Sequence, residues 1–345
     1  MRPLPLSWLP SSVAAALALA LAAPAAAATP LHRLAGETVM TALAGPPRAS
    51  FLAQVRDGDV GGVILVGQWR STAQMAEVVR TLQSAACEHG TPLLLAVDQE
   101  GGPTRRLPWA APAESASALG IRDAAHTEHE ARAAAAALRR AGISIDLAPV
   151  ADTRLSPANF LGSRTFSSDP TVVGQLATAF VRGLQTGGVA ATAKHFPGLG
   201  AAKENTDQHA VSVQLVRLQP FRDAIAAGVR LVMMSNASYP HLDPSGRPAV
   251  FSRTIITKLL RGSLGFDGVV VSDALDAPTP NATPHAPARA IDAGVDLLLY
   301  TSGSAARRGY ESLLADASTS ARLRAQLAAA VERIRGLKAW LGSSC

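Results

Sequence analysis

Residues 264–273 read LGFDGVVVSD, which is a turn, a short apolar run and a terminal aspartate. The run Val269–Val271 shows no alternation of apolar and polar side chains, a pattern typical of a parallel strand that is covered on both faces. Gly265 and Gly268 mark the turn before it. Asp273 therefore follows the carboxyl end of a predicted buried strand.

Other short apolar runs of the same kind occur along the chain, and segments with helical periodicity separate them. The eight predicted strands are Thr38–Ala42, Gly62–Val66, Leu93–Val97, Ile143–Leu147, Val189–Ala193, Leu231–Met234, Val269–Val271 and Asp296–Tyr300. Helix start signals fall between them, at Ser71 before Ala73–Glu88 and at Asp169 before Thr171–Thr186. Strands and helices that alternate in this way predict an α/β fold, a closed TIM-type (β/α)8 barrel formed as a single domain.

The chain has 345 residues, of which 48% are hydrophobic and 17% are charged. One barrel takes about 250 residues, so a barrel with extensions accounts for the length. The net charge of +6 is scattered and includes only short arginine pairs, unlike the basic stripe of a nucleic-acid-binding protein. We expect a monomer with no nucleic-acid partner.

The N-terminus has the features of a secretory signal peptide. Arg2 is followed by an Ala- and Leu-rich stretch, and the small residues Ala26 to Ala28 follow that stretch. A membrane anchor is the alternative, but the apolar stretch is short and Pro24 interrupts it. We therefore expect residues 1–28 to be removed and residues 29–345 to form the barrel with a helical tail at 318–342. The predicted location is outside the cytoplasm, secreted, periplasmic or associated with the cell wall, with no membrane span.

The two cysteines, Cys87 and Cys345, lie far apart in the sequence. They have no metal-site spacing, and an oxidising compartment would permit them to pair. The sequence leaves their pairing open.

Most of the unusual polar residues follow predicted strands. They are Asp98, Glu100, Asp152, Arg164, Lys194, His195, Asp207, His209 and Asp273. Each taken alone has an ordinary structural explanation, as a helix cap or as half of an ion pair. Taken together they point to one pocket, because the active sites of this fold lie at the carboxyl ends of the strands.

Five ordered segments give the chain a family resemblance. They are Val97–Gly102 (VDQEGG), Leu147–Asp152 (LAPVAD), Leu161–Phe166 (LGSRTF), Lys194–Gly198 (KHFPG) and Leu264–Asp273. Together they resemble glycoside hydrolase family 3, and more narrowly its single-domain bacterial β-N-acetylhexosaminidases.

This resemblance implies a retaining mechanism, in which a carboxylate forms a covalent glycosyl-enzyme that water then hydrolyses. Asp273 occupies the position of the family's nucleophile. Asp207-Gln208-His209 matches the Asp-x-His arrangement of the similar hexosaminidases, in which the His is the acid/base and the Asp orients it. A protonated His209 is able to donate to the leaving oxygen, and Asp207 would fix its tautomer.

The sequence departs from the family pattern beside this pair. Leu199 replaces the second His expected in the Lys-His-Phe-Pro-Gly-His-Gly run, and the stretch Ala201–Thr206 is longer than expected. An acid/base from elsewhere on the loop, such as Glu204, is the alternative to His209.

The resemblance assigns substrate binding to Asp98, Arg106, Arg164, Lys194 and His195. Pro103 and Ala277 replace an Arg and a Met of the family pattern, so we expect them to alter the pocket walls. Trp69 and Trp109 are equally open to two interpretations, as platforms for sugar stacking or as packing residues.

The leading hypothesis is an exo-acting β-N-acetylhexosaminidase that removes terminal N-acetylglucosamine from cell-wall fragments of the muropeptide type or from related oligosaccharides. No cofactor and no metal is expected. The alternatives are a β-glucosidase or β-xylosidase of the same family and an inactive exported sugar-binding barrel. Phosphorolysis is a minor hypothesis, because a His acid/base repels phosphate less than a carboxylate does.

Overall fold

The computed structural model describes residues 29–67 and 69–345, so the predicted signal peptide lies outside the described residues. Eight parallel strands form one sheet: β1 (Val39–Leu43), β2 (Gly62–Leu65), β3 (Leu94–Val97), β6 (Ile145–Asp146), β7 (Ala190–Phe196), β8 (Leu231–Met234), β9 (Val269–Ser272) and β10 (Leu298–Tyr300). Their order is β10-β1-β2-β3-β6-β7-β8-β9, and a parallel bridge between Val271 and Leu297 brings its two ends together. The predicted (β/α)8 barrel is confirmed.

Each predicted strand is present, and the boundaries differ most at β6 and β7. Strand β6 ends at Asp146 because Pro149, shortly after it, has no backbone N–H to donate. Strand β7 continues beyond the predicted Ala193 to Phe196 and so includes Lys194 and His195. These two polar side chains are buried there because each has a carboxylate partner.

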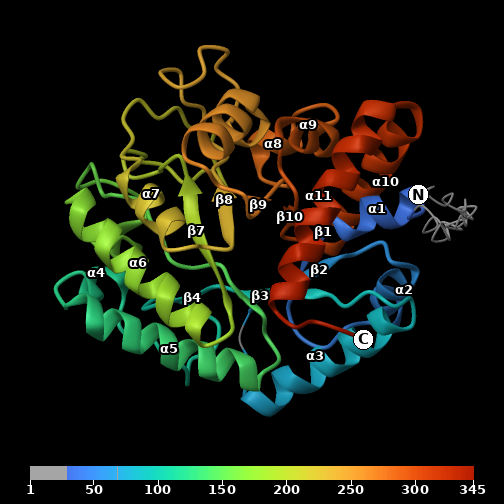
Figure 1. Cartoon of the computed structure of the whole chain (residues 1–345), viewed down its shortest axis with the longest axis horizontal. Helices are drawn as coiled ribbons and strands as arrows, with labels where there is room; N and C mark the ends of the chain where they lie inside the picture. The colour runs from blue at the N-terminus through green and yellow to red at the C-terminus, as the bar shows by residue number, and fades with distance from the viewer. Residues whose placement is uncertain (1–28, 68) are drawn as a thin grey trace, which may run out of the picture.

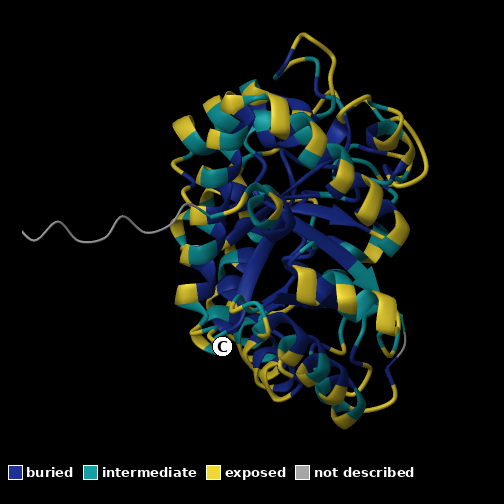
Figure 2. Cartoon of the chain, turned by 90° about the vertical axis from the view of Figure 1, so that its right-hand side faces the viewer, coloured by how far each residue is buried: buried dark blue, intermediate teal, exposed yellow. Residues whose placement is uncertain are grey.

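Helices surround the sheet (Figure 1). The α-helices are α1 (Leu31–Glu37), α2 (Ala49–Asp57), α3 (Thr72–Cys87), α4 (Ala116–Leu119), α5 (Ala124–Arg140), α6 (Pro170–Thr186), α7 (Gln219–Ala226), α8 (Pro278–Asn281), α9 (Ala286–Ala293), α10 (Gly303–Thr319) and α11 (Ala321–Trp340). A π-helix, η3 (Thr254–Ser263), lies between β8 and β9, and the short 3-10 helices are η1 (Gly162–Arg164) and η2 (Ala249–Phe251). The predicted N-caps are confirmed: the Ser71 hydroxyl accepts from the N–H of Gln74, and the Asp169 carboxylate accepts from that of Thr171. The strands are buried and the helices expose their outer faces (Figure 2).

Two apolar clusters hold the barrel together. The larger lies between the sheet and the helices and includes Leu95 and Phe180. The smaller fills the inside of the barrel and includes Met40, Leu94 and Leu231. The barrel is therefore a packed core and not a channel.

Helix α11 covers the amino-terminal end of the barrel. Its residues Ile334 and Leu337 belong to the cluster inside the barrel. Arg335 of the same helix donates to the carboxylate of Glu37 at 2.7 Å, and Glu37 lies just before β1. The opposite end, where the carboxyl ends of the strands lie, is left for a site.

A disulfide joins Cys87, the last residue of α3, to the C-terminal Cys345. Their Cα atoms are 5.3 Å apart. The pairing that the sequence left open is thus present in the structure.

The loop after β3 contains a small hairpin, made of β4 (Gln99–Gly101) and β5 (Thr104–Arg105). The buried side chain of Gln99 donates to three carbonyls, those of Leu107, Ala110 and Ala111. It also accepts from the N–H of Leu107 at 3.0 Å. One glutamine thus fixes the loop that carries Arg106.

Candidate active site

A cavity of about 270 Å³ opens at the carboxyl end of the barrel. Among its lining residues are Asp98, Arg106, Arg164, Lys194, His195, Asp207 and Asp273. These are all but one of the residues for which the sequence predicts a role in catalysis or substrate binding. The exception is His209, which does not line the cavity.

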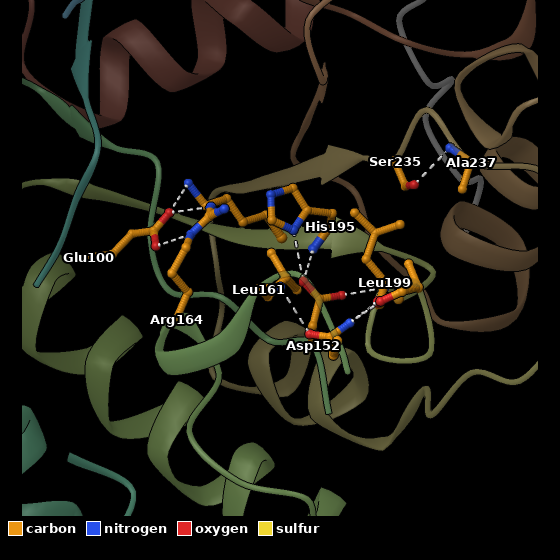
Figure 3. Close-up of polar contacts among 12 residues, drawn as sticks. Glu100, Asp152, Leu161, Arg164, His195, Leu199, Ser235 and Ala237 are labelled. Atoms are coloured by element: carbon orange, nitrogen blue, oxygen red, sulfur yellow. Dashed lines mark hydrogen bonds and ion pairs between the residues drawn. The ribbon is translucent and has the colours of Figure 1, made fainter. Parts of the chain in front are cut away.

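Lys194 and Arg164 meet at a shared carboxylate on one side of this cavity. The Lys194 ammonium lies 2.6 Å from Glu100 Oε1, and it donates to Asp98 Oδ1 at 2.8 Å. Arg164 donates to both Glu100 oxygens at 2.8 Å, as Figure 3 shows. The Lys194 residue is only 2% exposed. This is a buried, paired charge network of the kind that needs good hydrogen-bond geometry to be stable.

Burial and pairing act in opposite directions on the pKa values of this network. Burial would raise the pKa of Glu100, but Lys194 and Arg164 lower it to about 2. Burial would lower the pKa of Lys194, but Asp98 and Glu100 raise it above its ordinary value. Both groups are therefore charged at neutral pH.

Asp98 differs from Glu100 because it lines the cavity. Its Oδ1 accepts from Lys194, and its Oδ2 lies 3.9 Å from an Arg106 nitrogen, longer than a hydrogen bond. Oδ2 is therefore available to accept from a ligand hydroxyl. Charged groups of this kind are suited to sugar hydroxyls.

A second buried carboxylate, Asp152, orients His195. Asp152 Oδ2 accepts from the His195 ring nitrogen Nδ1 at 2.7 Å and from its backbone N–H at 3.1 Å. Asp152 Oδ1 accepts from the N–H of Leu199 at 2.6 Å (Figure 3). Since Nδ1 is occupied, Nε2 is the ring nitrogen that remains for a ligand in the cavity.

Asp273 lies directly after β9 and is half-buried. Its backbone N–H donates to the Met234 carbonyl at 3.0 Å, which ties it to the neighbouring strand β8. Its Oδ1 accepts from the N–H of Ala274 at 2.8 Å. Oδ2 makes no hydrogen bond within the described part of the chain, so one carboxylate oxygen is available to react.

The loop after β7 brings Asp207 to the cavity wall but leaves His209 outside it. Partial dehydration and the negative charge of Asp273 raise the pKa of Asp207 to about 6. His209 is exposed, and its backbone N–H donates to the Asn205 carbonyl at 3.0 Å. Glu204 is also exposed and does not line the cavity. The structure does not bring together Asp273 and either predicted acid/base.

This loop is fixed at both ends. The Asn159 side chain donates to the carbonyls of Leu199 and Ala202 at 2.8 and 2.7 Å. On the far side, backbone hydrogen bonds of 2.9 Å join Val211 and Val213 to Ser238. Residues 203–210, which include Asp207 and His209, form the span between these anchors.

Of the residues that depart from the family pattern, some line the cavity and others do not. Leu199 lines the cavity, as expected for a residue that changes a wall. Pro103 and Ala277 do not line it, and their effect on the pocket walls stays a prediction. Trp69 is 4% exposed and packs in the core, whereas Trp109 is 42% exposed on the loop after β3, and neither lines the cavity.

Sequence reasoning assigned no role to Glu100 or Asp152 beyond their positions after strands. Both are buried acidic residues, and such residues are rare unless they are paired. That signal identifies them as parts of a network, but it does not identify their partners. Among residues 29–67 and 69–345, no group of three or more His, Cys, Asp or Glu side chains has the arrangement of a metal site.

A barrel whose carboxyl-terminal face holds a small cavity, paired charges and an available carboxylate is compatible with a glycoside hydrolase. Residues 37–337 match the family model described as the glycosyl hydrolase family 3 N-terminal domain. The chain belongs to glycoside hydrolase family 3 and is a glycoside hydrolase.

Named relatives agree with this assignment. A β-hexosaminidase of Stenotrophomonas maltophilia is 36% identical in an alignment of 284 residues that covers 74% of this chain and 82% of that one. An uncharacterized secreted glycosyl hydrolase of Arthroderma benhamiae is 35% identical in an alignment of 295 residues that covers 80% of this chain and 83% of that one.

None of the helices in the described residues is long and apolar enough to cross a membrane.

Solved structures give the same result. The β-N-acetylhexosaminidase of Beutenbergia cavernae superposes with a TM-score of 0.85 at 34% identity, covering 90% of this chain and 99% of that one. A family 3 β-N-acetylglucosaminidase of Paenibacillus has a TM-score of 0.84 at 31% identity and covers 92% of this chain and 63% of that one.

Proposed function

We propose that this glycoside hydrolase is a retaining, exo-acting β-N-acetylhexosaminidase that removes terminal N-acetylglucosamine from cell-wall fragments or related oligosaccharides. In this proposal Asp273 is the nucleophile, His209 is the acid/base and Asp207 orients His209. Asp98, Arg106, Arg164, Lys194 and His195 bind the sugar.

The observation that carries the proposal is the position of Asp273. Its free Oδ2 belongs to a carboxylate on the wall of the cavity that Lys194 and Arg164 also line. Attack by Oδ2 on the anomeric carbon breaks the glycosidic bond, and the leaving oxygen takes a proton from the acid. Water then attacks the glycosyl-enzyme, gives up a proton to the same group and releases the sugar with its original anomeric configuration.

The size of the cavity supports exo action. Pockets for drug-sized ligands have volumes of about 300–1,000 Å³, and this one holds about 270 Å³. That volume suits one sugar ring and not an internal segment of a polysaccharide. The packed core of the barrel closes the inner end of the cavity, which supports entry by a chain end.

The role of His209 requires a movement of residues 203–210. In this structure Asp207 lies on the cavity wall and His209 does not. Partial dehydration and the negative charge of Asp273 raise the pKa of Asp207, so a movement of this span that takes Asp207 away from Asp273 favours its ionised form, which is able to orient His209. His209 is then able to approach the leaving oxygen from the span between the anchors at Ala202 and Val211.

The choice of the N-acetylated sugar is supported by the relatives, whose names are β-hexosaminidase and β-N-acetylhexosaminidase. The lining of the cavity also includes the apolar side chains of Leu147, Leu199 and Met233. A wall of this kind is able to contact the methyl group of an acetamido substituent.

Hydrolysis of an aryl β-N-acetylglucosaminide, compared with the aryl β-glucoside, tests the proposal. We expect the purified protein to hydrolyse the acetamido substrate and His209→Ala to slow it by about 10²–10⁴-fold. Glu204→Ala is the matched control on the same loop and should act as the wild type does. A preference for the glucoside would refute the assigned sugar, and an unaffected His209→Ala would refute the assigned acid/base.

One observation favours a second candidate, an inactive sugar-binding barrel, because the predicted acid/base stands outside the cavity. Inactivity on both substrates, together with measurable binding of N-acetylglucosamine, would support that candidate. Turnover with and without inorganic phosphate distinguishes hydrolysis from phosphorolysis.

Export from the cytoplasm is part of the proposal. The Cys87–Cys345 disulfide supports it, because disulfides persist in oxidising compartments. The Arthroderma benhamiae relative is described as secreted. Sequencing the N-terminus of the protein recovered from the culture medium or periplasm should give Thr29 as the first residue.

A further inference from the structure

Lys194, Arg164, Asp98 and Glu100 form the paired charge network beside the cavity, and Glu100 is the member of these four that does not reach the cavity. It is 4% exposed and does not line the cavity, although Lys194, Arg164 and Asp98 all do. Its two oxygens take three close contacts, one from Lys194 and two from Arg164. Glu100 therefore does not contact a bound sugar directly, and it affects the sugar only through Lys194 and Arg164.

We propose that Glu100 is a positioning residue that fixes Lys194 and Arg164, as one rigid unit, at the spacing that the sugar requires. This inference rests on the proposed function only in taking Lys194 and Arg164 as groups that bind the substrate. It adds a determinant of affinity that lies behind the wall of the cavity.

The geometry assigns separate tasks to the two carboxylates around Lys194. Glu100 Oε1 contacts Lys194 and also accepts from Arg164, so this oxygen links the two cations. Asp98 uses Oδ1 for Lys194 and keeps Oδ2 toward the cavity. Because Glu100 supplies the second negative charge, Asp98 does not have to neutralise both cations and remains able to accept from a ligand.

Glu100 is unsuited to proton transfer. Its neighbouring cations hold its pKa at about 2, so it carries no proton to donate at neutral pH and is a very weak base. Its effect on catalysis must therefore come from the positions and charges of its partners.

Removing the charge of Glu100 lowers the pKa of Lys194, which a loss of packing alone would not do. In Glu100→Gln the buried Lys194 keeps Asp98 as a partner but loses Glu100, while burial and Arg164 continue to lower its pKa. Lys194 then loses its proton at a lower pH. The carboxamide also offers one acceptor oxygen where the carboxylate offered two, so Arg164 loses its paired contact.

The experiment compares Glu100→Gln, Glu100→Asp and Glu37→Gln in the full chain. Glu37 is a matched control, because it is also a buried glutamate between an arginine and a lysine, Arg335 and Lys338, but lies at the opposite end of the barrel. Three quantities are measured: kcat/KM, the pH profile of the dissociation constant of N-acetylglucosamine by titration calorimetry, and the melting temperature.

We expect Glu100→Gln to weaken sugar binding and to reduce kcat/KM by about 10–100-fold, as the loss of supporting partners commonly does. The alkaline limb of its pH profile should move down by about one pH unit or more. Glu100→Asp keeps the charge on a shorter side chain, so it should lose affinity and keep the wild-type limb. Glu37→Gln should lower the melting temperature and leave affinity and pH profile unchanged.

Equal sugar affinity and an equal alkaline limb in wild type and Glu100→Gln would overturn the inference. If Glu100→Gln does not fold, Glu100→Asp carries the test through the dissociation constant. A wild type that binds N-acetylglucosamine but hydrolyses no glycoside would refute the proposed function, and the calorimetry would still decide the role of Glu100. A wild type that fails to bind the sugar at all would overturn both.

Discussion

Asp273 and Asp267 lie near the two ends of strand β9, and they are a natural pair for comparison. Asp273 lines the cavity with one oxygen free, whereas Asp267 is exposed before the strand begins. We expect Asp273→Asn to reduce kcat by at least about 10³-fold, because an amide is unable to form the glycosyl-enzyme. Asp267→Asn should keep wild-type kcat. Steady-state rates of the two variants at matched melting temperature check this, and equal losses in both would argue against a catalytic Asp273.

Asp146 gives a prediction about pH and stability. It is fully buried at the end of β6, Oδ1 accepts from the N–H of Gln99, and burial raises its pKa to about 8. Its folded pKa is above its unfolded value, so its contribution to stability is full below about pH 4 and is lost as the pH rises through about 8. Asp146→Asn removes this loss because the amide stays neutral.

The melting temperature of Asp146→Asn, measured relative to wild type, should therefore rise between pH 5 and pH 8 and level off above that. Asp123→Asn is the control, because Asp123 is an exposed helix N-cap. A difference between Asp146→Asn and wild type that is constant from pH 5 to pH 9 would contradict the account.

At the scale of elements, the loop after β7 depends on the loop after β6. The buried Asn159 side chain holds the carbonyls of Leu199 and Ala202 and so fixes one end of the span 203–210. We expect Asn159→Ala to destabilise this anchor by about 1–3 kcal/mol, because two buried carbonyls lose their donor. Lys203 is exposed beside the anchor, so tryptic cleavage after Lys203 should become faster.

The cleavage rate and the new N-terminus at Glu204 are the measurements, with Asn281→Ala as the control because Asn281 is exposed at the end of α8. Unchanged cleavage after Lys203 in Asn159→Ala would show that the anchor lies elsewhere.

The elements also show what the sequence pattern is able to predict. Short runs rich in apolar residues located all eight barrel strands, and the unbroken ones among them, such as Leu231–Met234, carry the signal of burial on both faces. The β4–β5 hairpin was not predicted, because its conformation depends on contacts that Gln99 makes to residues 107–111. The position of His209 could not be predicted either, since anchors on other loops decide where it lies.

In the candidate site, too, some features follow from the local sequence pattern and others depend on distant contacts. Six of the nine polar residues that the sequence assigned to one pocket line the cavity, because the barrel brings strand ends together whatever the loops do. Glu100, Asp152 and His209 do not line it. The pairings of Glu100 with Arg164 and of Asp152 with His195 join residues 64 and 43 positions apart. No local pattern encodes such a pair.

At the scale of the whole molecule, the disulfide ties the end of the chain to α3. It closes a loop of 258 positions, which includes most of the barrel. Cross-links over loops of this size are expected to add about 2–5 kcal/mol to the free energy of unfolding. Cys87→Ser should therefore lower the melting temperature, and dithiothreitol should lower that of the wild type but not that of the variant.

Thiol counting under denaturing conditions, before and after reduction, provides the control for this experiment. Two free thiols in the unreduced, exported protein would contradict the pairing. A melting temperature that does not change when both thiols are shown to be free would contradict its role in stability.

The most direct test of the central claim is to trap the glycosyl-enzyme. The protein is incubated with a fluorinated N-acetylglucosaminide that slows hydrolysis of the intermediate, and the adduct is mapped by peptide mass spectrometry. We predict one added glycosyl unit on Asp273, absent from Asp273→Asn and reduced by competing substrate. An adduct on another carboxylate such as Asp207, or an active enzyme that forms no adduct and releases the inverted anomer, would contradict it.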